Sequence, residues 1–287
     1  MSLLFEPFAL AFVQRALIVG ALVAVICAVV GTWVVLRGMA FLGEAMAHGM
    51  LPGIAAATLL GIPPVFGAAV SAAAMSAGIG MLQRRGRLSA DTSIGLLFVA
   101  SLALGVIIIS ASRSFATDVT AILFGDILAT TVDDLVMLAV VAAVTLAVAM
   151  VGHRSFVALT VDPRQARMLG LHPRSAQVVL VGLITLAVVA AYQAVGSLLV
   201  VGMLLGPAVA AGCWARRIPS TMALAALFGA AAVVVGMLLS WHLETAAGAT
   251  IALAAILGAA GSSLVRQLLP RGVDRREKSE NNAERLV

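Results

Sequence analysis

The sequence predicts an all-α fold, a polytopic membrane helical bundle of about nine spans, within a range of eight to ten. Three observations predict it: the composition, the length of the apolar stretches and the positions of the arginines. Of the 287 residues, 62% are hydrophobic and 11% are charged, whereas soluble domains carry about 25% charged residues. The mean hydropathy is +1.12. The apolar stretches approach the roughly 20 residues needed to cross a bilayer core.

This composition excludes several classes of protein. No soluble enzyme of this size could cover so much apolar surface with so little charge, and a disordered protein would be far more polar. Cys27 and Cys213 are the only cysteines. They are too few for a disulfide scaffold, and each lies in an apolar run where a thiol packs as a small hydrophobe. The net charge of +5 arises between the apolar stretches, so it does not indicate nucleic-acid binding.

Each apolar stretch is interpreted as one helix. The segment Gly61-Ile62-Pro63-Pro64 separates two of them, because Gly and Pro interrupt helices. The long stretch over 177–213 is divided near Gly196, and Pro207 interrupts its second half. The predicted spans are 8–36, 40–61, 64–82, 91–111, 131–151, 177–193, 195–213, 220–240 and 247–267.

The arginines predict the orientation, because loops rich in Lys and Arg stay in the cytoplasm. The segments 84–87, 154–174, 216–217 and 266–285 are basic, while 241–246 has no arginine. With nine spans, the N-terminus then lies outside. Arg15 is the exception, since it falls near the outer end.

The chain is divided into a single transmembrane domain, 1–269, and a polar cytoplasmic tail, 270–287, which we expect to be disordered. Asp133 and Asp134 are predicted to cap the span that they precede. His153 and His172 fall in the basic loop and are predicted to be surface residues.

The sequence has no energy source of its own. A phosphate-binding loop needs Gly-x-x-x-x-Gly-Lys-Ser/Thr, and the only lysine, Lys278, follows Glu277. The His-Glu-x-x-His and Gly-x-Ser-x-Gly motifs of zinc proteases and esterases are also missing. We therefore predict that the chain is not an enzyme.

Glu44 and His48 are the clearest candidate functional residues, because ionisable groups inside a span are costly and are kept for a purpose. They are four residues apart, so they share one face of a helix. A carboxylate and an imidazole can together bind a divalent cation. The alternative is a hydrogen bond between the two that only ties helices together.

His242 and Glu244 form a second candidate metal-binding pair, in a short external turn beside Trp241, a predicted interfacial anchor. The alternative is that both are solvated loop residues.

A short cytoplasmic helix is predicted from Asp162 to Gly170. Asp is a common helix cap, Pro is favoured in the first turn, and Gly is a natural stop. Such a helix can dock onto a cytoplasmic partner or lie on the protein's own surface. The candidate coupling residues are Asp162, Pro163, Arg164, Arg167, Leu169 and Gly170.

Several blocks, in order over about 12–261, resemble the permease subunit of the zinc/manganese/iron importers of the ABC transporter superfamily. The first block starts at Val34, near the end of the first predicted span, and runs through Arg37 and Glu44-Ala-Met-Ala-His48 to Leu51-Pro52-Gly53 in the second. The other blocks are Ala90 to Gly95, Leu123-Phe-Gly-Asp-Ile-Leu128, Asp162 to Leu171, and Gly196-Ser-Leu-Leu-Val200 continuing to Gly206-Pro207-Ala208.

The resemblance implies a homodimeric permease in a bacterial plasma (inner) membrane, with a fold related to the vitamin B12 importer. It implies two copies of a cytoplasmic ATP-binding subunit, an external solute-binding protein and a cation path at the dimer interface. No cofactor is implied, because the divalent metal is the transported substrate.

The same resemblance assigns roles to single residues. His48 matches the family histidine, while Glu44 replaces an aspartate. Glu244 aligns with another family aspartate, and Ala246 and Ala247 replace a Pro-Ser pair. These differences indicate a divergent branch with a substrate that could differ from zinc or manganese.

Two other functions compete with an importer permease. A self-sufficient secondary transporter or channel would use an ion gradient, and an inverted repeat with broken helices would be its sign. No convincing repeat is visible. An intramembrane enzyme is the third candidate, but no catalytic motif supports it.

Overall fold

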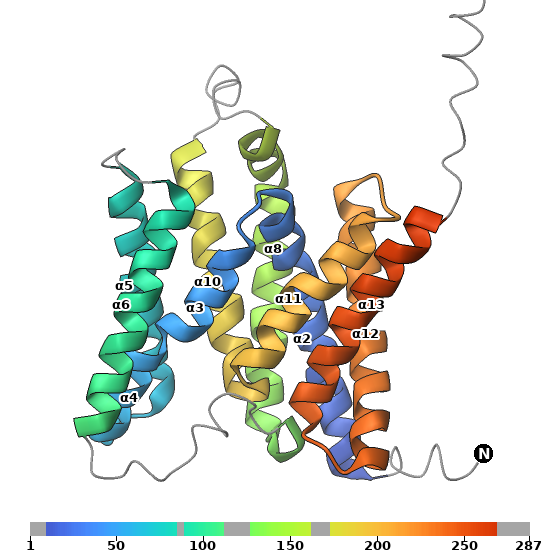
Figure 1. Cartoon of the computed structure of the whole chain (residues 1–287), viewed down its shortest axis with the longest axis horizontal. Helices are drawn as coiled ribbons and strands as arrows, with labels where there is room; N and C mark the ends of the chain where they lie inside the picture. The colour runs from blue at the N-terminus through green and yellow to red at the C-terminus, as the bar shows by residue number, and fades with distance from the viewer. Residues whose placement is uncertain (1–9, 85–88, 112–126, 162–172, 269–287) are drawn as a thin grey trace, which may run out of the picture.

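The computed structural model describes residues 10–84, 89–111, 127–161 and 173–268. The described chain is helical throughout (Figure 1). In chain order, its elements are α2 (Ala11–Leu36), α3 (Ala40–Gly49), α4 (Leu51–Leu59), α5 (Pro64–Arg84), α6 (Ala90–Ala111), the 3-10 turn η2 (Ile127–Ala129), α8 (Val132–Val161), α10 (Pro173–Val195), α11 (Ser197–Gly212), α12 (Ile218–Leu243) and α13 (Ala247–Leu268).

All nine predicted stretches are helical, which confirms the all-α membrane bundle. Within the described ranges, seven helices are long and apolar enough to cross a membrane. The two exceptions are the stretch 40–61, which forms the shorter α3 and α4, and the stretch 195–213, which forms α11 with Pro207 inside it.

The break between α3 and α4 comes at Met50 and has a local cause. Pro52 lacks the N–H that the carbonyl of His48 would accept in a continuous helix, and its ring crowds that carbonyl. The next carbonyl, on Gly49, accepts a hydrogen bond from Ser71 Oγ of α5 at 2.7 Å. The helix therefore ends at Gly49, directly after His48.

The two predicted breaks between spans are confirmed by positive φ angles. Gly61 has φ +68° between α4 and α5, and Gly196 has φ +78° between α10 and α11. Side chains other than glycine rarely adopt this region. The predicted division of 177–213 into two helices near Gly196 is therefore confirmed.

The helices alternate in direction, so the loops gather at two ends of the bundle (Figure 1). At one end, uppermost in Figure 1, α2, α5, α8, α11 and α13 finish. The basic segments of the sequence follow these helix ends, as the cytoplasmic assignment requires. α2 begins at the opposite end, and the N-terminus outside stays a prediction.

α2 lies in the core, where most of its residues are buried, and it packs against α8, α11 and α12. Trp33 of α2 is fully buried and packs edge-on against Phe156 of α8. His153 makes a similar contact with Trp33, with ring centroids 5.8 Å apart. The prediction that His153 lies in a loop is therefore wrong, because α8 continues ten residues past the predicted span and carries the half-buried histidine onto α2.

The cap of α8 also differs from the prediction. Asp133 and Asp134 lie inside the first turn. Thr131 precedes the helix, and its N–H and hydroxyl both donate to Asp134 Oδ2, at 2.9 and 2.7 Å. Asp134 N–H donates back to Thr131 Oγ1 at 3.3 Å. This is a capping box in which Asp134 is the acidic partner.

Cys27 is fully buried and Cys213 is half-buried at the end of α11, so both pack as predicted. His172 and the tail 270–287 lie outside the described residues. The division of the chain at 269 stays a prediction.

Candidate functional site

α3 brings Glu44 and His48 together, as their spacing predicts. His48 Nε2 lies 2.9 Å from Glu44 Oε1 across one helical turn. The two side chains are 21% and 36% exposed, respectively, whereas Ala45, Met46 and Ala47 around them are buried. This face of α3 is therefore partly exposed on the surface of the chain, while the other faces are packed.

The imidazole of His48 is held from one side by an aromatic cluster. Phe98 of α6 lies with its ring centroid 5.7 Å from that of His48, and it also packs edge-on against Phe41 of α3 at 5.6 Å. His48 Nδ1 is buried, with no hydrogen-bond partner among the described residues. When Nε2–H donates to Glu44, the neutral ring keeps a lone pair on Nδ1.

Phe98 is expected to position the His48 ring. Replacing Phe98 with alanine removes the contact and should lower substrate uptake severalfold, whereas Phe98→Leu should keep most of it, because leucine still fills the space. Uptake by cells with equal amounts of the two proteins measures this difference. Equal rates for Phe98→Ala and the unaltered chain would contradict it.

His242 and Glu244 lie at the opposite end of the bundle from the basic segments. His242 is in the last turn of α12 rather than in a turn beyond it, and its Nδ1 lies 2.8 Å from the Leu238 carbonyl oxygen. Glu244 ends the helix with φ +51°, a left-handed conformation. Glu244 also lines a cavity of about 470 Å³ together with Ser240 and Trp241.

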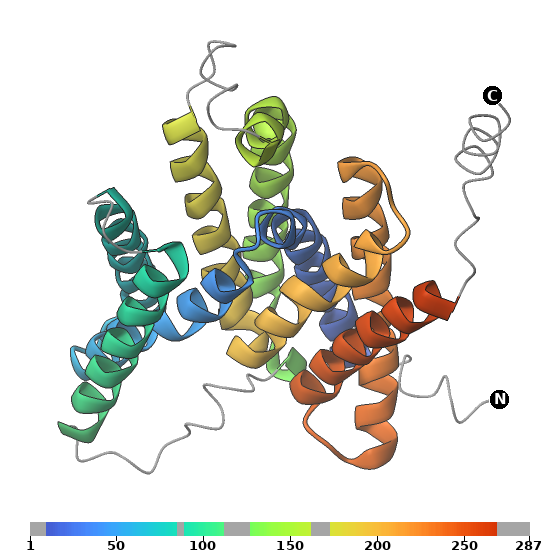
Figure 2. The same ribbon diagram turned by 45° about the horizontal axis from the view of Figure 1, so that its top comes forward.

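The two candidate pairs do not meet within one chain. α3 packs against α5, α6, α10 and α11, while the turn from α12 to α13 lies apart from it in both views (Figures 1 and 2). Among the described residues, no three His, Cys, Asp or Glu side chains gather closely enough to hold a metal ion. A cation at either pair therefore needs ligands beyond these described side chains.

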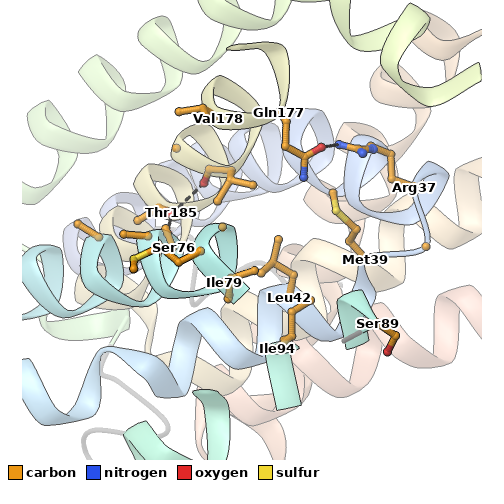
Figure 3. Close-up of a pocket in the computed structure, with 17 residues that line it drawn as sticks. Arg37, Met39, Leu42, Ser76, Ile79, Ser89, Ile94, Gln177, Val178 and Thr185 are labelled. Carbon is orange, nitrogen blue, oxygen red and sulfur yellow. Dashed lines mark hydrogen bonds between the residues drawn. The ribbon is translucent and has the colours of Figure 1, made fainter. Parts of the chain in front are cut away.

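One polar feature was missed by the sequence interpretation. Arg37 follows α2 and donates from Nη1 to Gln177 Oε1 of α10 at 2.6 Å, and both residues line a cavity (Figure 3). Burial lowers the pKa of the Arg37 guanidinium from its usual value. The only sequence signal was a charge placed directly after an apolar stretch.

A family model described as the ABC 3 transport family matches residues 9–265. The chain belongs to this family. The permease predicted from the sequence blocks is thus confirmed. This ABC 3 chain is the membrane permease subunit of a bacterial ABC importer, a multi-pass membrane protein whose ATPase is a separate subunit.

Curated relatives of this ABC 3 permease cover most of its length. It is 36% identical to the manganese transport system membrane protein MntC of Listeria innocua over 246 residues, which is 86% of this chain and 88% of the relative. It is 35% identical to the chelated iron transport system membrane protein YfeD of Yersinia pestis over 252 residues, 87% and 84% of the two chains.

Solved structures share its fold. PsaBC from Streptococcus pneumoniae, in complex with Fab, matches with a TM-score of 0.81 and 31% identity, covering 96% of this chain and 99% of that one. A metal-chelate type ABC transporter in an inward-facing conformation matches with a TM-score of 0.72 at 17% identity, over 89% and 86% of the chains. The second match shows the fold alone.

The predicted coupling residues, from Asp162 to Gly170, lie outside the described residues of this ABC 3 permease. α8 ends at Val161 and α10 begins at Pro173, at the end of the bundle where the basic segments attach. Their predicted helix and its role stay predictions.

Proposed function

We propose that this chain forms the translocation path for a divalent metal cation, as a homodimer that takes the ion from an external solute-binding protein and is driven by two copies of the ATPase subunit. The observation that carries the proposal is the Glu44–His48 pair, half-open on a helix inside an apolar bundle. The names of the relatives, which refer to manganese and chelated iron, support a metal as the cargo.

The chemistry of the pair suits a metal that passes through. Carboxylate and imidazole groups bind divalent manganese, iron and zinc. One chain supplies two ligands, so a two-fold axis beside this face would bring four together. A site built from two half-sites and water would bind weakly, and weak binding is what rapid passage requires. Glu44, in place of the family aspartate, extends the carboxylate by one methylene and can alter the choice of metal.

His242 and Glu244 are proposed to contact the cation at the outer end, before it reaches Glu44 and His48. With Nδ1 engaged by the Leu238 carbonyl, His242 keeps Nε2 available for a ligand. A glutamate in the left-handed region costs of order 1 kcal/mol, and such strain is often kept at functional sites.

Transport should require the ATPase. In vesicles that contain the purified permease alone, we expect no ATP hydrolysis and no accumulation of Mn²⁺. Adding the ATPase subunit, the binding protein and ATP should start uptake, because the sequence has no phosphate-binding loop. Radioactive or fluorimetric Mn²⁺ uptake measures this. Accumulation driven by an ion gradient without the ATPase would instead favour the secondary transporter.

The segment from Asp162 to Gly170 is proposed to couple the ATPase to the permease. Changing Leu169 to aspartate places a charge on the predicted docking helix, so ATP-dependent uptake should fall at least about tenfold, the range of a lost interfacial hot spot. Thermal unfolding of the permease should be unchanged. Copurification of the ATPase with the variant reports the coupling directly, and full uptake by Leu169→Asp would place the contact elsewhere.

A further inference from the structure

A cavity of about 940 Å³, whose lining is drawn in Figure 3, lies towards the end of the bundle where the basic segments attach, because Arg37, Ser89 and Gln177 in its lining stand near helix ends there. It lies between α3, α5 and α10, with Arg37 and Ser89 near the ends of their helices and with Ser76 and Thr185 deeper along α5 and α10. This volume is at the upper end of the range for small-molecule sites, roughly 300–1,000 Å³. No role has been assigned to it above.

The cavity exists because the facing helices carry small residues. A Cβ atom added to Gly80 of α5 or to Gly182 of α10 would meet nothing within 4 Å. Ala73 and Ala77 continue the same face of α5. Large apolar side chains, among them Leu42, Ile79, Ile94 and Val178, form most of the remaining wall.

The polar groups deep in the cavity are already satisfied. Ser76 Oγ and Thr185 Oγ1 lie 2.9 Å apart, so one hydroxyl can donate to the other. Each oxygen also lies 2.8 Å from a backbone carbonyl oxygen of its own helix. They offer little to a polar ligand. The deep part of the cavity therefore suits an apolar chain.

Arg37 gives one end of the cavity a positive charge, whereas the interior is mostly apolar. It is the only charged side chain among the described residues that line the cavity. Its recorded partner is the neutral amide oxygen of Gln177, and among the side chains that the structure describes no carboxylate pairs with it. A guanidinium has five N–H donors in a planar fork, so it can still bind an anion with two parallel hydrogen bonds.

We propose that this cavity binds an anionic phospholipid of the cytoplasmic leaflet, with its phosphate on Arg37 and an acyl chain between α5 and α10. Arginine matches phosphate geometry better than any other side chain. Basic pockets between membrane helices on the cytoplasmic side are suited to anionic head groups. A soluble anion would leave the apolar interior unfilled. One lipid molecule would pair its phosphate with the guanidinium and fill the apolar interior with an acyl chain.

Such a lipid would also touch α3. Met39 and Leu42 line the cavity, and Leu42 is two residues before Glu44 on the same helix. The lipid would fill the space between α5 and α10, two helices that both contact α3. It would thereby support the helix that carries the Glu44–His48 pair without contacting the pair itself.

The test uses the purified complex of permease and ATPase in a neutral detergent, with dioleoyl phosphatidylglycerol and phosphatidylcholine as probes. Native mass spectrometry measures retained lipid, and titration measures the apparent affinity. We expect preferential binding of phosphatidylglycerol. Arg37→Gln should weaken it about tenfold or more, as expected for the loss of charge-assisted hydrogen bonds. Arg216→Gln, at the same end but outside the lining residues, should leave it unchanged.

A second variant tests the interior. Gly182→Leu fills open space and should reduce phosphatidylglycerol binding while the complex keeps its elution volume and melting temperature. Equal binding of the two lipids, or equal phosphatidylglycerol binding by Arg37→Gln and the unaltered complex, would overturn the proposal. Displacement of phosphatidylglycerol by millimolar inorganic phosphate alone would also overturn it, because it would identify a soluble anion as the ligand. A disulfide between two copies carrying Gly182→Cys would do the same, because it would identify a second chain as the occupant.

Discussion

His48→Ala is expected to reduce metal uptake at least about 10- to 100-fold, the loss that metal sites show when even a supporting group is removed. The imidazole supplies one of only two ligands on α3, and its Nε2 lies 2.9 Å from the carboxylate that supplies the other. Without it, Glu44 alone remains on α3, so the cation would lose one of the two groups that replace its water ligands there. Uptake of ⁵⁴Mn²⁺ by cells that express the complex measures the effect.

Variants of the two partners separate transport from helix packing. Glu44→Asp keeps the carboxylate and should retain uptake with an altered ratio of manganese, iron and zinc, whereas Glu44→Gln should lose it. His153→Ala is the matched control, because that histidine packs on Trp33 away from the pair. It should transport normally once the amount of protein is equalised. Wild-type uptake by His48→Ala would mean that the pair is only a hydrogen bond between neighbouring turns.

The positions of the helices were largely readable from the sequence, because chain length and bilayer thickness fix each span. Gly61 and Gly196 mark two turns as predicted, and both have positive φ angles that favour glycine. The break at Met50 was missed. Its cause, Pro52, was visible, but apolar composition alone does not distinguish one long helix from two short ones with a turn between them.

The site was predictable only where it depends on local spacing. Glu44 and His48 are one turn apart on any helix, so their contact follows from the sequence. The contact of Phe98 with His48 joins residues from separate helices, and the Arg37–Gln177 hydrogen bond joins residues 140 positions apart. Such contacts are decided by tertiary packing. His153 shows the same limit, because its ring contact is with Trp33 of another helix.

The crossing of α4 and α5 should be among the points of the fold most sensitive to mutation. Gly53 and Gly67 face each other there, and a Cβ atom on either would collide with the backbone carbonyl of the other. Because neither backbone can yield as a flexible side chain would, Gly53→Ala should lower the free energy of unfolding by about 1–3 kcal/mol. It should also reduce uptake, since α4 begins two residues after Gly49 and supports the end of α3 that carries His48.

Gly258→Ala in α13, where nothing lies within 4 Å of the added methyl group, is the matched control and should be neutral or slightly stabilising. Thermal unfolding of the purified permease in detergent compares the two variants, and equal melting temperatures would mean that α4 and α5 do not make this backbone contact.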